Sequence, residues 1–168
     1  MIIDGRKIAL EILDEVSLMV KELPLPPRLT VFSCAPNFET KKFLAIKQKK
    51  ATLVGIEITV IEFDEDTKLP DMISELTMAD KTSDGIVVQL PFPPTIKIQT
   101  LLEKISPLKD VDVLFYDGAN VEILPPVVGA IEVIAKNYQI DFFNKQVVVV
   151  GNGRLVGVPA FLYAKHKG

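Results

Sequence analysis

Two side chains within residues 38–54 could do chemistry on a flat organic substrate. Phe43 and Lys47 are four residues apart, so on a helix they share one face. A ring beside an amine can stack on a ring system while the amine acts as an acid or base, and lysine is a base near neutral pH only when burial or neighbouring charges lower its pKa. The alternative is a solvated basic helix with Phe43 in the core, because four further lysines lie between positions 41 and 50.

Further polar residues fall near the ends of predicted strands. Gln89 lies near the end of the apolar segment 85–90, and ligands of open α/β sheets bind outside the carboxyl ends of the strands. A glutamine there could bind a ligand, hold a catalytic amine, or only cap the strand. If their segment is extended, the side chains of Asp110 and Asp112 would lie on the same side of the chain as each other. They could then bind a metal or the amino groups of a heterocycle. A solvated loop is the alternative for these two carboxylates.

A glycine-rich turn follows the apolar segment Gln146–Val150 and precedes a predicted helix. Gly151 and Gly153 would let a pyrophosphate approach the backbone, where the helix N-terminus supplies N–H donors. Gly157 comes one residue later than in the usual G-x-G-x-x-G spacing. The acidic residue expected roughly 20 positions further on would lie beyond Gly168. A plain strand-to-helix turn is the alternative to phosphate binding.

The elements that must position these residues alternate along the chain. Apolar spacing predicts helices over 8–23, 38–54, 70–80, 96–105 and 128–138, and strands over 29–35, 56–63, 85–90 and 146–150. Asn37 is expected to cap the second helix and Gly55 to end it. Strands that alternate with helices predict a parallel sheet covered on both faces.

The predicted fold class is therefore α/β, with an N-terminal three-layer parallel-sheet domain followed by the beginning of a Rossmann domain. We assign residues 1–123 to the first domain, 124–145 to a linker helix and connection, and 146–168 to the first strand, glycine turn and helix start of the second. A βαβ unit needs about 30 residues, so the second domain is expected to be incomplete. Its exposed strand edge at 147–150 predicts poor solubility or self-association.

Composition excludes several other classes of protein. The chain has 168 residues, 48% hydrophobic and 24% charged, with a net charge of −3, so it is globular and lacks the basic footprint of a nucleic-acid-binding protein. One cysteine and one histidine allow no intrachain disulfide and predict no metal site. No apolar segment reaches the roughly 18 residues of a membrane span, and the start lacks a secretion signal. We expect a cytoplasmic protein.

Five segments together resemble the methylenetetrahydrofolate dehydrogenase/methenyltetrahydrofolate cyclohydrolase family. The most specific is GIVVQLPFP at 85–93, which is close to the family's GILVQLPLP. The others are IIDGR at 2–6, KQKKA at 47–51 with VGI at 54–56, PLKDVD at 107–112, and GNGRLVGVP at 151–159. Shikimate dehydrogenase-like proteins share the architecture but not the VQLP and KDVD segments.

The resemblance implies a two-lobed homodimeric enzyme of one-carbon metabolism, with a tetrahydrofolate substrate in the cleft and NADP, or NAD, on the second lobe. Hydride transfer would give methenyl-tetrahydrofolate, which water opens to formyl-tetrahydrofolate. By position, Lys47 is the catalytic lysine, Gln89 holds it, and Asp112 reads the amino-pyrimidine edge of the pterin. Further implied contacts are Phe43, Leu90 and Pro91 for the substrate, and Gly151, Asn152, Gly153, Arg154, Val156 and Gly157 for the cofactor.

Several positions depart from the family pattern. Phe43 stands where the family has tyrosine, so the ring is kept and a hydroxyl worth about 1 kcal/mol in hydrogen bonding is lost. Val113 replaces the glycine after KDVD, and Asn152 and Gly153 replace the arginine and serine of GRS. The alternative function is a non-catalytic folate- or partner-binding paralogue. For the 168-residue chain, no efficient NADPH formation from methylene-tetrahydrofolate is expected.

Overall fold

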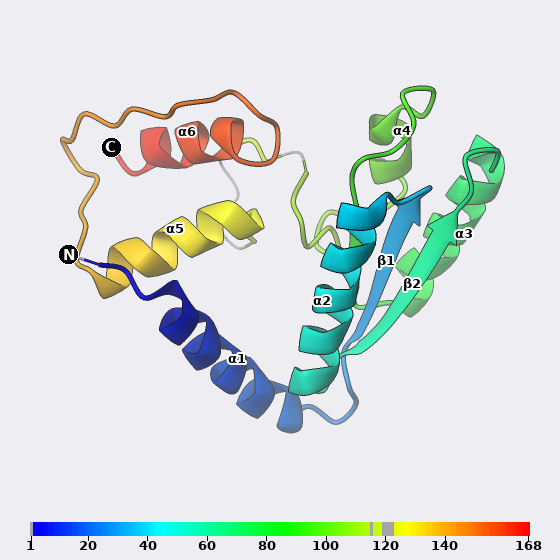
Figure 1. Ribbon diagram of the computed structural model, residues 1–168, viewed down its shortest axis with the longest axis horizontal. Coiled ribbons are helices and arrows are strands. Elements are labelled where there is room, and N and C mark those ends of the chain that lie inside the picture. Colours follow the sequence, from blue (N-terminus) through cyan, green and yellow to red (C-terminus); the bar gives the residue numbers. More distant parts are fainter. Residues whose placement is uncertain (1, 115, 119–122) are drawn as a thin grey trace. The chain divides into compact units, whose positions relative to one another are not determined.

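The computed structural model describes residues 2–114, 116–118 and 123–168 (Figure 1). Two compact units divide the chain, residues 1–110 and 111–168. The predicted boundary at 123 adjoins residues 119–122, which lie outside the described residues. The elements of the first unit are α1 (Gly5–Lys21), β1 (Arg28–Cys34), α2 (Phe38–Val54), β2 (Glu57–Phe63), α3 (Leu69–Thr82), β3 (Gly85–Val88) and α4 (Ile98–Leu102). Those of the second are α5 (Pro126–Asn137) and α6 (Gly157–His166).

The ends of α2 are set by local chemistry, as the sequence predicts. The Asn37 side chain accepts a hydrogen bond from the backbone N–H of Thr40 at 2.9 Å, which satisfies one of the donors that a helix start leaves open. Gly55 follows the helix with φ +87°, a left-handed conformation that glycine adopts without a Cβ clash. A Cβ on Gly55 would also meet the Val20 side chain of α1 at 3.1 Å. Both predicted boundaries of this helix are confirmed.

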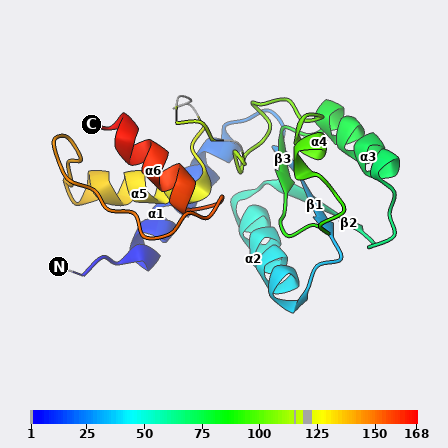
Figure 2. The same ribbon diagram turned by 90° about the horizontal axis from the view of Figure 1, so that it is seen from above.

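The sheet has three parallel strands in the order β2-β1-β3. Val31 in the central strand is level with Val60 in β2 and Val87 in β3. Figure 1 and Figure 2 show α2 on one face of this sheet and α3 on the other. Consequently β1 is buried over most of its length. This architecture confirms the predicted parallel sheet with helices on both faces.

The segment 96–105 contains a shorter helix than the sequence pattern predicts. Helix α4 covers five residues. After it, Lys104 N donates to Leu101 O at 3.0 Å and Ile105 N donates to Leu102 O at 3.1 Å. These i→i+3 hydrogen bonds belong to tight turns and not to a continuing α-helix. The chain thereby turns back toward β3.

Helices α5 and α6 pack against each other in the second unit (Figures 1 and 2). Tyr116, Val128 and Tyr163 form the buried cluster. The Tyr163 hydroxyl lies 3.3 Å from a Glu132 carboxylate oxygen, which also accepts a hydrogen bond from Lys167 Nζ at 3.0 Å. Burial, followed by the charge of Glu132, raises the pKa of Tyr163. A polar pair therefore joins the two helices beside their apolar contact.

The predicted buried strand at Gln146–Val150 is wrong. These residues have no strand conformation, and Val148 and Val150 are 80% and 96% exposed. A strand gains its hydrogen bonds only from a neighbouring strand, and within the described residues all three strands of the sheet belong to the first unit. Because exposed apolar side chains can drive association, self-association of this protein stays a prediction.

The single cysteine provides a direct test of packing at the end of β1. Cys34 is 3% exposed, and its Sγ lies 3.5 Å from the carbonyl oxygen of Asp64. Burial, with the nearby carboxylates of Glu65 and Asp64, raises the pKa of the thiol. Because the thiolate is the reactive form, Cys34 should react with a colorimetric thiol reagent at neutral pH far more slowly in native protein than in urea. Equal rates in the two conditions would contradict this packing.

Candidate active site

Lys47 and Phe43 lie on one face of α2, next to the face that packs on the sheet. Leu44 and Ala51 are buried from this helix, whereas Phe43 is 49% exposed and Lys47 is half-buried. The Lys47 ammonium lies 5.0 Å from the centroid of the Phe43 ring, within the range of a cation–π contact. The ring and the amine are thus adjacent, as four-residue spacing on a helix requires.

Gln89 connects this lysine to the sheet. Its backbone N–H donates to the carbonyl of Phe32 in β1 at 2.8 Å, so the residue is fixed just beyond the carboxyl end of β3. Its side-chain Nε2 donates to the Leu90 carbonyl at 3.1 Å. Its Oε1 accepts a hydrogen bond from Lys47 Nζ at 3.0 Å. The carboxamide is therefore oriented from both ends, and it aims its oxygen at the amine.

Three of the side chains singled out from the sequence therefore come together at the carboxyl edge of the sheet. Phe43 can stack on a planar group, Lys47 can donate a proton or stabilise negative charge, and Gln89 orients the amine. Leu90 and Pro91 follow directly, are joined by a cis peptide bond, and continue from the same strand end. Among the described residues, no group of three or more His, Cys, Asp or Glu side chains could hold a metal ion.

Asp112 belongs to the second unit, which begins at Val111. It is half-buried and two residues beyond Asp110, whose backbone pairs with Ile86 of β3 in a parallel bridge. The next residue, Val113, has φ +46°, in the left-handed region that favours glycine. A non-glycine residue there costs roughly 1–2 kcal/mol. The valine therefore adopts a backbone conformation that a glycine would adopt without a Cβ clash.

The glycine turn at 151–157 leads into α6. Val156 N and Val158 N both donate to the carbonyl of Gly153, at 3.3 and 3.1 Å. A Cβ on Gly157 would lie 2.7 Å from the carbonyl carbon of Gly151, so the third glycine permits close packing of the turn on the helix start. Nothing lies within 4 Å of a Cβ built on Gly151 or Gly153, so the space beside the backbone is open at both positions.

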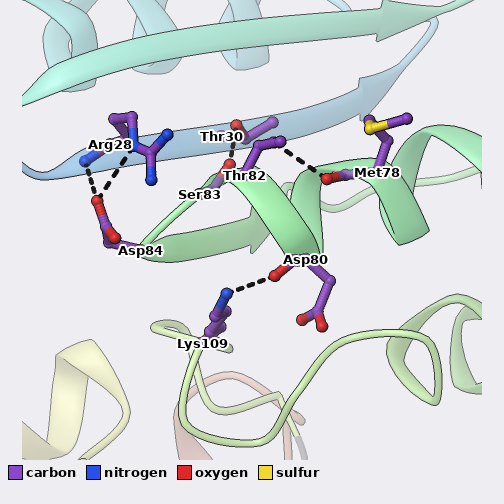
Figure 3. A network of polar contacts seen from close by, with 8 residues as sticks. All are labelled: Arg28, Thr30, Met78, Asp80, Thr82, Ser83, Asp84 and Lys109. Carbon is purple, nitrogen blue, oxygen red and sulfur yellow. Dashed lines mark hydrogen bonds and ion pairs between the residues drawn. The ribbon is translucent and has the colours of Figure 1, made fainter.

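One group of polar contacts outside the lysine–glutamine pair has no signal in the sequence. The Asp80 carboxylate at the end of α3 accepts hydrogen bonds from Ser106. Figure 3 shows the second contact of this residue, in which Lys109 Nζ donates to the Asp80 carbonyl. Asp80 and Ser106 are 26 residues apart, and neither lies in a recognisable motif. Only the fold brings them together.

The fold and these contacts define an α/β domain with a lysine–glutamine pair at the carboxyl ends of parallel strands. The sequence model described as tetrahydrofolate dehydrogenase/cyclohydrolase, catalytic domain, matches residues 3–112. The chain belongs to this family.

Named relatives and solved structures agree with this assignment. The bifunctional protein FolD of Lactobacillus delbrueckii subsp. bulgaricus is 32% identical, over 94% of this chain and 60% of its own length. The crystal structure of the bifunctional enzyme FolD from Campylobacter jejuni has a TM-score of 0.89 and 25% identity, over 98% of this chain and 63% of that one. The Trypanosoma brucei enzyme complexed with NADP cofactor and inhibitor has the same TM-score and identity, over 99% and 61%. The chain thus spans about 60% of the length of the curated relative.

None of the helices in the described part of the chain is long and apolar enough to cross a membrane.

Proposed function

We propose that this chain carries the folate-binding and catalytic part of a methylenetetrahydrofolate dehydrogenase/methenyltetrahydrofolate cyclohydrolase. The observation that supports this most directly is the hydrogen bond of 3.0 Å between Lys47 Nζ and Gln89 Oε1. Chance placement of a lysine on an exposed helix would leave its amine in solvent. Here the amine is half-buried, adjacent to an aromatic ring, and held by a glutamine whose own position is fixed by the sheet.

In the cyclohydrolase step, water adds to the methenyl carbon of methenyl-tetrahydrofolate. One proton of the water is released, the other passes to the ring nitrogen as its bond to that carbon breaks, and formyl-tetrahydrofolate forms. Lys47 would exchange a proton with the attacking water or stabilise the charge that develops beside it. Gln89 keeps the amine oriented, and Phe43 stacks on the planar pterin. Asp112 would accept hydrogen bonds from the amino-pyrimidine edge.

For the dehydrogenase step, NADP, or NAD, would supply the acceptor for the hydride that leaves the methylene bridge of methylene-tetrahydrofolate. The solved Trypanosoma brucei relative is a complex with NADP, and the open backbone at Gly151 and Gly153 suits a pyrophosphate. Asn152, Arg154, Val156 and Gly157 would complete this part of the site. We also propose that the protein is cytoplasmic and forms a homodimer, as its family resemblance implies.

The second candidate function is a folate-binding paralogue without catalysis. The observation that favours it is the loss of the tyrosine hydroxyl at Phe43, directly beside the Lys47 ammonium. A hydroxyl at this position could bond to the amine or to the substrate, and Phe43 can do neither. Binding of folate would then persist because stacking needs only the ring.

Hydrolysis of 5,10-methenyltetrahydrofolate by the 168-residue protein separates the two functions. We expect loss of the methenyl absorbance to be faster than in buffer alone, and Phe43→Tyr to raise kcat/KM by about fivefold, as one restored hydrogen bond of about 1 kcal/mol predicts. The control is Phe38→Tyr, on the same helix and 76% exposed, which should change nothing. Saturable binding of methenyl-tetrahydrofolate with no hydrolysis by wild type or Phe43→Tyr would favour the paralogue, and absence of both would refute both functions.

A further inference from the structure

The segment that leads to Asp112 is anchored by a carboxylate outside the proposed active site. Asp80 accepts a hydrogen bond from the backbone N–H of Ser106 at 2.7 Å and from its hydroxyl at 2.8 Å. Both oxygens of the Asp80 carboxylate therefore accept hydrogen bonds from the same residue. Lys109 Nζ donates to the Asp80 carbonyl, and Lys109 N donates to the Ser106 carbonyl at 2.7 Å. Residues 106–109 thus form a turn that hydrogen bonds hold to the end of α3, and Figure 3 shows the contact of Lys109 with Asp80.

The same hydrogen bonds also hold the segment 109–110, which pairs with the outer edge of β3. Ile86 N donates to the Lys109 carbonyl at 2.7 Å, and Ile86 pairs with Asp110 in a parallel bridge. Ile86 is fully buried, whereas Asp110 is half-buried. The segment 109–110 therefore extends the sheet by one short contact on the side of β3 that faces away from β1. Asp112 follows two residues later, a reach of about 7 Å.

We propose that Asp80 is a positioning residue for folate recognition, because it fixes residues 106–110 against β3 and so sets the start of the segment that presents Asp112. This inference rests on the proposed function, in which Asp112 reads the pterin. Asp80 touches no substrate in this scheme and acts only through Ser106 and Lys109. The electrostatics agree: the hydrogen bond from the Ser106 backbone, and secondarily its hydroxyl and the charge of Lys109, lower the pKa of Asp80, against the effect of burial.

Asp84 provides a matched control four residues further along the chain. Its carboxylate also accepts a backbone N–H, that of Arg28 at 2.8 Å, and the bond from Arg28 likewise lowers its pKa. Figure 3 shows the Asp84–Arg28 pair and the Asp80–Lys109 contact as separate parts of the same view. Asp84 anchors the start of β1, at the end of the sheet opposite to Gln89. The charge of Lys109 also contributes to this lowering of the Asp84 pKa, but the hydrogen bonds of Asp84 go to Arg28. Removal of the Asp84 carboxylate should therefore disturb the start of β1 and leave intact the hydrogen bonds that hold Ser106 and Lys109 to Asp80.

The kinetic test compares Asp80→Ala, Asp80→Asn and Asp84→Ala in hydrolysis of 5,10-methenyltetrahydrofolate. Asp80→Ala should raise KM about tenfold and leave kcat within about twofold, because Lys47 is untouched while substrate recognition loosens. Asp80→Asn should restore KM to within about threefold, since its amide oxygen still accepts from Ser106 N. Asp84→Ala should leave KM within about twofold. A lower kcat with unchanged KM, or equal KM for both alanine variants, would overturn the inference.

Amide hydrogen exchange tests the anchoring without any ligand. Ile86 N bonds to Lys109, whereas Gln89 N in the same chain segment bonds to Phe32 of β1. Asp80→Ala should accelerate exchange at Ile86 at least tenfold relative to Gln89, and Asp84→Ala should not change that ratio. An unchanged ratio in Asp80→Ala would overturn the positioning role. Failure of wild type to bind or hydrolyse methenyl-tetrahydrofolate would instead refute the proposed function, whatever the exchange result.

Discussion

Replacing Lys47 with alanine is expected to reduce the kcat for hydrolysis of methenyl-tetrahydrofolate by roughly 10²–10⁴-fold, the usual contribution of a positioned proton-transfer group. The amine lies 3.0 Å from Gln89 Oε1, the acceptor that orients it. Removing the amine leaves Gln89 without the partner toward which its amide is oriented. The measurement is the initial rate of methenyl absorbance loss at saturating substrate.

The matched control for this experiment is Lys41→Ala. Lys41 lies on the same helix, carries the same charge, and pairs at 3.8 Å with Glu62, where both side chains are about half exposed or more. An exposed ion pair of this kind contributes about 0–1 kcal/mol, so both the rate and the stability should change little. Circular dichroism of Lys47→Ala should match wild type because its side chain is only half-buried. Equal kcat values for the two variants would show that Lys47 is not catalytic.

Much of the first unit is predictable because local and long-range signals agree there. Asn37 and Gly55 mark the two ends of α2 through capping and a left-handed conformation, which are local properties of those residue types. The spacing of Phe43 and Lys47 then determines that they share a face. Gln89 is predicted at a strand end, and its bond to the Phe32 carbonyl fixes it there.

The remainder depends on partners that a local pattern cannot contain. Four consecutive valines at 147–150 have high strand propensity, yet propensity produces a strand only where another strand supplies hydrogen bonds. The Asp80–Ser106 contact joins residues 26 positions apart, and neither residue type predicts it. Val113 shows the reverse case, since its β-branched side chain disfavours the φ of +46° that it adopts. The backbone path of the surrounding segment outweighs that local preference.

Phe32→Ala is expected to have the largest effect on stability, because Phe32 links the core to the candidate site. Its side chain is fully buried in β1, and its ring stacks on that of Phe63 with centroids 5.7 Å apart and planes 12° apart. Truncation of a buried phenylalanine costs about 3–5 kcal/mol. Since domains are stable by only about 5–15 kcal/mol, this is a large share of the free energy of unfolding.

Urea unfolding followed by circular dichroism measures this loss, with Phe38→Ala as the matched control. Phe38 is 76% exposed, so its truncation should change the free energy of unfolding by less than about 0.5 kcal/mol. Phe32→Leu keeps most of the buried volume and should lower the free energy of unfolding by less than about 1.5 kcal/mol. This variant can still be measured if Phe32→Ala does not fold. A loss below about 1 kcal/mol for Phe32→Ala would contradict the packing of β1. Because the Phe32 carbonyl holds the Gln89 backbone, the Leu variant should retain the lysine–glutamine pair and hence hydrolysis, which separates a failing core from a failing site.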